Sequence, residues 1–166
     1  MTAEWVARRR AMRHVGLGAS AWFIREPRAS QVLSRTEVFM DQIQAIASAI
    51  NGYFDLMYDA DDSRFAGVFH DACLVHGLRD GKLVAWSATG FRDLMRNRPS
   101  PAAMKSPRDQ EILSIEQTLP DMATAKVRVR IGQTGFVDHL VFHRIDGKWL
   151  ITAKAFHVAR VFPEGS

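Results

Sequence analysis

The sequence predicts an α+β fold, in which a curved antiparallel sheet carries helices on one face and encloses a conical cavity. Three observations predict it: a helical apolar pattern in the first half, alternating strands in the second half, and two Asp-Gly pairs at 80–81 and 146–147. Alternation with a period of two is typical of strands, and Asp-Gly is a strong hairpin signal. Helices grouped against one antiparallel sheet form an α+β domain, and such a cavity usually binds a small molecule.

The helical half begins at Ser34, which forms with Glu37 the S-x-x-E capping box of a helix start. From there to Asp59, large apolar residues recur at spacings of three and four. They are Phe39, Ile43, Ile46, Ile50, Tyr53 and Met57. A single apolar stripe of this kind predicts one long amphipathic helix.

A break, a short helix and a hairpin follow the long helix. Acidic residues interrupt the apolar pattern, and Asp62 or Ser63 can cap a short helix over residues 64–69. Residues 72–78 and 83–86 are expected to be the two strands of a hairpin. The Asp-Gly pair between them supplies the positive φ that a tight turn needs.

The second half of the chain is expected to form most of the sheet. Ser87 can cap a third helix over residues 88–98, and the Pro-rich segment 99–109 excludes a regular element and is a candidate for a mobile flap. Three long strands are then predicted, at residues 111–119, 124–131 and 136–145. The second Asp-Gly turn leads into a further strand over residues 148–158.

Positive charge is concentrated at the N-terminus. Residues 1–35 hold seven arginines against two glutamates, a net charge of +5, whereas residues 36–166 hold 15 basic and 16 acidic residues, a net charge of −1. The folded body therefore lacks the general positive charge of a nucleic-acid-binding protein. No apolar run reaches the ~20 residues of a membrane span. The single cysteine, Cys73, excludes an internal disulfide and fits a cytoplasmic location.

The basic extension, residues 1–35, permits three interpretations. Its "RRR" followed by "VGLGASAWFI" is similar to an export signal. It can also be a terminal arm lying on the surface, or the product of a start codon placed upstream of the true one. We expect the folded domain to span residues 36–160, with a short tail at 161–166.

Asp138 is the most informative residue of the strand 136–145. Period-two alternation places its carboxylate among three large apolar side chains, those of Phe136, Leu140 and Phe142. Burying a charge there is costly unless a partner neutralises it or it takes up a proton. One interpretation is a structural carboxylate paired with Lys154 or Arg144. The other is a functional group inside the cavity.

The order of elements and the C-terminal motif resemble a known family. The order is similar to the cone-shaped, cystatin-like fold of the nuclear transport factor 2-like superfamily. Within it, "VDHLVFHRIDGKWLITAKAFH" resembles the closing motif of the SnoaL-like, "putative lumazine-binding" family. The resemblance covers residues 38–158 and leaves residues 1–35 outside.

Ketosteroid isomerases of the same superfamily extend the resemblance to single residues. Tyr53 stands eight residues before Asp61, as their helix Tyr does before a helix-breaking Asp. Asp138 in "VDHL" takes the place of their protonated Asp, and His76 in "DACLVH" takes the place of their general base, which is an Asp. This departure argues against steroid isomerisation but retains acid-base chemistry, because other members of the superfamily resemble this arrangement with His as base.

The resemblance implies a proton-transfer site formed by Tyr53, Asp138 and His76. A carboxylic acid held neutral in an apolar pocket can donate a hydrogen bond to an enolate oxygen, together with a Tyr hydroxyl. A His with a pKa of about 6.5 can accept and release a proton near neutral pH. We therefore expect a cofactor-independent isomerase, polyketide cyclase-like enzyme or dehydratase. The alternatives are a non-catalytic ligand-binding or dimerisation module, a partner-binding protein that uses the basic arm, and structural roles for all three residues.

The cavity is expected to hold a small, largely apolar organic ligand, and no cofactor or metal. The residues expected to line it are Phe54, Met57, Phe69, Trp86, Phe91, Val127, Val129, Phe136, Leu140 and Phe156. His139 and His143 lie ~13 Å apart along one strand and cannot share a metal ion without a bend. Because the strand 136–145 is apolar on both faces, we expect a homodimer that pairs through the sheet.

Overall fold

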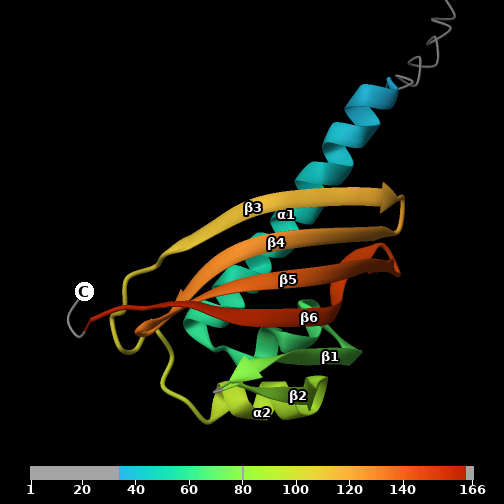
Figure 1. Cartoon of the computed structure of the whole chain (residues 1–166). Coiled ribbons are helices and arrows are strands. Elements are labelled where there is room, and N and C mark those ends of the chain that lie inside the picture. The colour runs from blue at the N-terminus through green and yellow to red at the C-terminus, as the bar shows by residue number, and fades with distance from the viewer. Residues whose placement is uncertain (1–33, 80, 164–166) are drawn as a thin grey trace, which may run out of the picture. The chain divides into compact units, whose positions relative to one another are not determined.

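The computed structural model describes residues 34–79 and 81–163 (Figure 1). Most of the basic extension therefore lies outside the described residues, so its three interpretations stay predictions. Among the described residues, no helix combines the length and the apolar character needed to cross a membrane.

The first helix, α1, spans Arg35–Asp59 and has the predicted capping box. The Ser34 backbone N–H donates to the Glu37 carboxylate at 2.7 Å, and the Glu37 N–H donates to the Ser34 hydroxyl at 3.2 Å. The helix ends at Ala60, whose φ of 54° is left-handed. The first turns extend beyond β3 (Figure 1), so Phe39 is 51% exposed rather than buried on the expected stripe.

The next four elements follow the predicted order with shifted bounds. A 3₁₀ helix, η1, spans Asp62–Gly67, and its cap is Asp61 rather than the expected Asp62 or Ser63. The strands β1, Phe69–Arg79, and β2, Lys82–Ser87, pair as a hairpin. Helix α2, Ala88–Arg96, begins with the predicted cap, because the Ser87 hydroxyl accepts from the Gly90 N–H. No helix or strand forms between α2 and the next strand, as we predicted from the prolines of the segment 99–109.

Four long strands complete a curved sheet of six (Figure 1). They are β3 (Gln110–Leu119), β4 (Met122–Ile131), β5 (Thr134–Ile145) and β6 (Lys148–Val161). The strand order is β2-β1-β6-β5-β4-β3, and every neighbouring pair is antiparallel except β1 and β6. The predicted curved antiparallel sheet is thus confirmed, apart from the parallel pairing of β1 with β6. A long connection, unlike a hairpin, allows two neighbouring strands to run in the same direction.

A bulge in β6 changes which residues face the helices. Phe142 of β5 pairs with Ile151, whereas Val141 pairs with Ala153, so Thr152 is the extra residue. Before the bulge the odd-numbered side chains of β6 are buried, and after it Lys154 is buried. An extra residue shifts the alternation of a strand by one position, and this shift turns Lys154 inward.

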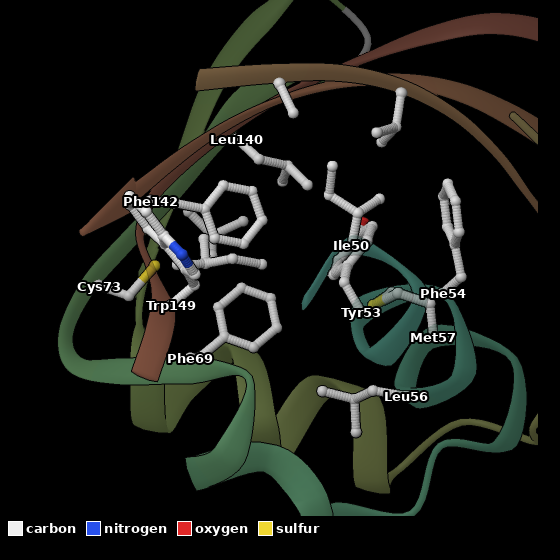
Figure 2. Packing of buried hydrophobic residues seen from close by; sticks show 14 of the residues in the cluster. Ile50, Tyr53, Phe54, Leu56, Met57, Phe69, Cys73, Leu140, Phe142 and Trp149 are labelled. Carbon is white, nitrogen blue, oxygen red and sulfur yellow. The ribbon is translucent and has the colours of Figure 1, made fainter. Parts of the chain in front are cut away.

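The helices cover one face of the sheet and enclose the hydrophobic core. Ile50 and Tyr53 of α1 lie near Leu140 and Phe142 of the sheet, with Phe69 beside them (Figure 2). All five are no more than 1% exposed. Each such side chain contributes roughly 1.5–3 kcal/mol through removal of its apolar surface from water.

Candidate functional site

Three buried polar side chains from distant parts of the chain meet on the inner face of the sheet. The Tyr53 hydroxyl donates to Oδ2 of Asp138 at 2.5 Å. The Lys154 ammonium lies 2.6 Å from the same oxygen and 2.5 Å from the Tyr53 hydroxyl. Tyr53 and Asp138 are 0% exposed and Lys154 is 4% exposed. We call these three residues the polar triad.

The local structure of each element positions its member of the triad. Tyr53 lies on the buried stripe of α1, in line with Ile46 and Ile50. Asp138 lies on the buried face of β5, where the alternation placed it. Lys154 reaches the same face only because of the bulge at Thr152, and its partner across the ladder is Leu140 of β5.

Hydrogen bonding within the triad leaves one oxygen of Asp138 without a partner. Oδ2 accepts from both Tyr53 and Lys154, whereas Oδ1 is buried and makes no hydrogen bond to any described residue. An unsatisfied buried acceptor costs about 1–3 kcal/mol. Oδ1 therefore keeps an unused capacity to accept a hydrogen bond.

Burial dominates the ionisation of the other two triad members. It raises the pKa of Tyr53 well above the usual value, and the neighbouring Asp138 charge adds to this effect. Burial lowers the pKa of Lys154, while Asp138 acts in the opposite direction. The triad thus contains a neutral phenol beside an ion pair. Because the pair is buried, removing either charged partner would strongly destabilise the protein.

The triad borders a cavity of about 150 Å³. Asp138 and Lys154 line it, and most of the remaining wall is apolar. Two arginines, Arg79 and Arg98, also line it. The rings of Trp86 and Phe156 stack with centroids 5.9 Å apart. The site therefore combines a mostly apolar wall with a few polar groups, as ligand pockets commonly do.

Gly77 of β1 allows one aromatic wall of the cavity to form. A Cβ atom added at Gly77 would lie 2.7 Å from the ring of Phe156 and 2.4 Å from the Phe156 carbonyl oxygen. Both distances are shorter than van der Waals contact, so only glycine leaves room for this ring.

Six of the ten apolar residues expected to line the cavity do so. They are Met57, Trp86, Phe91, Val129, Phe136 and Phe156. The other four are packed into the closed hydrophobic core and do not line the cavity: Phe54, Phe69, Val127 and Leu140. The sequence pattern could not separate the two groups, because one apolar face of the sheet runs from the core into the cavity.

The structure brings two of the three expected catalytic residues together and leaves the third outside. Tyr53 and Asp138 form a hydrogen bond, but His76 is exposed and does not line the cavity. On β1 it alternates with the buried Val75 and Gly77, so its side chain lies on the opposite face of the sheet. The expectation that His76 is the base at this site is therefore wrong in its geometry.

The structure bears on both interpretations of the Asp138 carboxylate, which pairs with Lys154 and also lines the cavity. Lys154 forms the ion pair that one of them specified, whereas Arg144 is exposed and makes no ion pair with any described residue. Within the triad, Asp138 acts as a hydrogen-bond acceptor, because both Tyr53 and Lys154 donate to Oδ2.

The sequence reasoning missed two cationic residues of the site, Arg79 and Arg98. It names Lys154 only as a structural partner of Asp138, because simple alternation along β6 hides the inward direction of this side chain. Arg79 ends β1, and Arg98 follows α2, where no periodic pattern exists to show which way a side chain faces. Among residues 34–79 and 81–163, no group of metal-ligating side chains is close enough to hold an ion.

Comparisons with known proteins agree with this architecture. The model of the family described as "Putative lumazine-binding" matches residues 41–157. A curated relative, "Aldolase FrzH" from a Cladobotryum species, is 25% identical over 118 residues, which cover 70% of this chain and 90% of the relative.

Solved structures show the same fold at low sequence identity. A nuclear transport factor 2-like protein of unknown function from Silicibacter pomeroyi is 19% identical, with a TM-score of 0.66 over 72% of this chain and 98% of that protein. A ketosteroid isomerase-like protein from Erwinia carotovora atroseptica is 11% identical, with a TM-score of 0.57 over 72% of this chain and 97% of that protein. Both support the nuclear transport factor 2-like fold.

Proposed function

The chain belongs to the "Putative lumazine-binding" family, and from this premise we propose that its cavity binds a small, largely apolar carbonyl compound and moves a proton on the carbon next to the carbonyl. The reaction needs no cofactor. One observation carries the proposal: Asp138 is among the residues that line the cavity, and its buried oxygen Oδ1 makes no hydrogen bond to any described residue.

The proposed step uses each triad member once. Oδ1 of Asp138 takes the proton from carbon, and the C–H electron pair moves into an enolate whose charge rests on the carbonyl oxygen. The Lys154 ammonium has three N–H donors, of which two are used within the triad, so one is free for that oxygen. A preorganised cation in a dry site stabilises such an oxyanion strongly. Tyr53 holds the carboxylate through Oδ2.

The fate of the enolate would decide the reaction class. Return of the proton to another carbon gives an isomerisation, loss of a leaving group gives a dehydration, and attack on a second carbonyl carbon gives a cyclisation or an aldol addition. The name of the Cladobotryum relative, an aldolase, supports a reaction of this kind, since aldol addition starts with the same proton removal.

Deuterium exchange tests the proposed step. In D₂O, the protein should speed the loss of the protons next to the carbonyl of phenylacetone, followed by ¹H NMR. Asp138→Asn should remove this acceleration, because an amide oxygen is a far weaker base. Asp71→Asn, an exposed change on β1, is the matched control and should retain it.

Two outcomes would count against the proposal. Equal acceleration in the Asp138→Asn protein would exclude Asp138 as the base. Tight binding without any exchange would favour the second candidate function, a non-catalytic ligand-binding module in which the buried ion pair only shapes the pocket.

We also propose that two copies pair through the outer face of the sheet. Leu74, Leu78 and Leu83 are 59%, 49% and 72% exposed there, and Leu78 pairs with Leu83 across the β1–β2 hairpin. Neighbouring exposed leucines of this kind are typical of an interaction surface.

A further inference from the structure

The charged groups that line the cavity do not balance. Among the described residues that line it, Asp138 is the only acidic one, and Lys154 neutralises it. Arg79 and Arg98 remain, and neither forms an ion pair with any acidic side chain of the described residues. Residues 36–166 carry a net charge of −1, so the two excess positive charges are a local property of the cavity.

Arg98 is the more enclosed of the two arginines. It follows α2 and is half-buried, and its Nη2 donates to the Met57 carbonyl oxygen, near the end of α1, at 3.4 Å. Burial lowers the pKa of Arg98, but a guanidinium stays protonated at neutral pH. One long hydrogen bond leaves most of its five N–H donors available. A desolvated cation without a counter-charge is costly, and an anion bound beside it would recover that cost.

Arg79 is the second unpaired arginine among the residues that line the cavity. Its side chain is exposed, and the guanidinium carbon lies 5.8 Å from the centroid of the Trp86 ring. A guanidinium beside an aromatic ring is stabilised by the ring and keeps its hydrogen-bond donors available. The cavity wall thus carries two arginines together with aromatic rings.

The volume limits what can enter. About 150 Å³ is the size of an apolar protein cavity that accommodates one benzene ring. Asp138 lines the cavity, and its carboxylate would repel an anion. Arg98, in contrast, lies close enough to Tyr53 and Lys154 to affect their pKa values. Arg98 is therefore the cation beside the triad at which the anionic group of an acidic ligand would be bound, with the ring of the ligand among the aromatic residues.

We propose that the ligand is a small carboxylic acid with a single ring, whose carboxylate is bound by Arg98, with Arg79 as a second contact. The assignment rests on the proposed function because it uses the same cavity. It narrows the ligand from an apolar carbonyl compound to an acid.

A binding experiment separates this assignment from catalysis. The probes are phenylacetate and its neutral counterpart phenylacetamide, titrated into the full chain by calorimetry or NMR. The wild-type protein should bind phenylacetate roughly tenfold or more tightly than the amide, because hydrogen bonds to charged groups contribute about 1.5–3 kcal/mol. Arg98→Gln should remove this preference.

Two further variants keep the test decisive. Arg128→Gln removes the same charge from the outer face of the sheet, away from the cavity, and should keep the preference of the wild-type protein. Arg98→Lys retains the charge and should keep part of the preference, which covers the case in which Arg98→Gln does not fold.

Three outcomes would overturn the assignment: equal affinity of the wild-type protein for both probes, no binding of phenylacetate at millimolar concentration, or an equal loss of preference in Arg128→Gln. If the protein shows no preference for phenylacetate but still catalyses Asp138-dependent exchange of phenylacetone, the acid-binding assignment is wrong and the proposed function is retained. A phenylacetate preference without any exchange would overturn the proposed step and retain the acid-binding site.

Discussion

The inner face of the sheet has two regions that use similar residues for opposite purposes. In the closed core, Phe142, Ile151 and Trp149 belong to the same buried apolar cluster as Ile46 and Ile50, and none of these five residues carries a charge. At the cavity, β5 and β6 present a buried ion pair with an unpaired oxygen beside an unfilled volume, and the Tyr53 phenol of α1 contacts this pair. The first region gains stability from packing, whereas the second gives up stability to keep polar groups out of water.

This contrast indicates where function lies. A buried polar network that is only partly satisfied persists in a folded protein when the rest of the structure compensates for it. The closed core supplies that compensation. We therefore expect changes in the core to alter stability and changes in the triad to alter both stability and binding.

The largest effect is expected in the core. Phe142→Ala should lower the free energy of unfolding by about 3–5 kcal/mol, since it removes a 0% exposed ring and leaves a cavity. Urea denaturation would measure this loss. Leu119→Ala, at a residue that is 54% exposed, is the control and should change stability by less than about 0.5 kcal/mol. A loss below about 1 kcal/mol in Phe142→Ala would show that the core is not the tightly packed region.

The next effect tests the ion pair. Lys154→Met leaves the Asp138 charge buried without its cation and should cost about 3 kcal/mol. The double variant Lys154→Met, Asp138→Leu should recover most of this loss, because two packed apolar side chains replace the pair. Thermal and urea denaturation of the single and double variants form the measurement. A double variant that is less stable than Lys154→Met alone would contradict the contrast between the two regions.

A smaller effect concerns Tyr53 and alkaline pH. Tyr53→Phe removes a hydrogen bond to a carboxylate and should cost about 1.5 kcal/mol at pH 8. The pKa of Tyr53 is raised in the folded state, so the unfolded chain loses this proton first as the pH passes about 10. The stability that Tyr53 contributes is therefore fully present below pH ~10 and declines above it.

The difference between the wild-type protein and Tyr53→Phe should accordingly narrow above pH ~10. Urea denaturation at pH 8 and near pH 10.5 would show it. A gap that widens with pH would mean that the folded state favours the phenolate, and the neutral phenol assigned to the triad would be wrong.

The smallest effect on folding is expected on the outer face. Leu78→Lys should leave the free energy of unfolding of the monomer within about 0.5 kcal/mol, because the side chain is 49% exposed. It should abolish dimer formation, which sedimentation equilibrium measures. The wild-type protein sedimenting as a monomer at all concentrations would exclude the homodimer proposal.

The bulge in β6 shows why the inward direction of Lys154 could not be predicted from the sequence. Alternation counted from Ile151 directs Lys154 toward the outer face, yet the extra residue Thr152 reverses it. His76 shows a related difficulty, since Leu74 and Leu78 make its face of β1 as apolar as the face of Val75. Where both faces of a strand are apolar, alternation alone cannot tell which one is buried.

The local features of this chain could be predicted from the sequence alone, because they depend on residues close to one another in the sequence. The capping box at Ser34, the cap at Ser87, the hairpins and the inward direction of Asp138 each depend on interactions within a few residues along the chain, so residue types and spacing suffice to predict them. The meeting of Tyr53, Asp138 and Lys154 depends on strand order, on one bulge and on contacts up to 101 residues apart. Such contacts form only when the whole sheet has closed around its core, and for that reason the folded structure alone decided them.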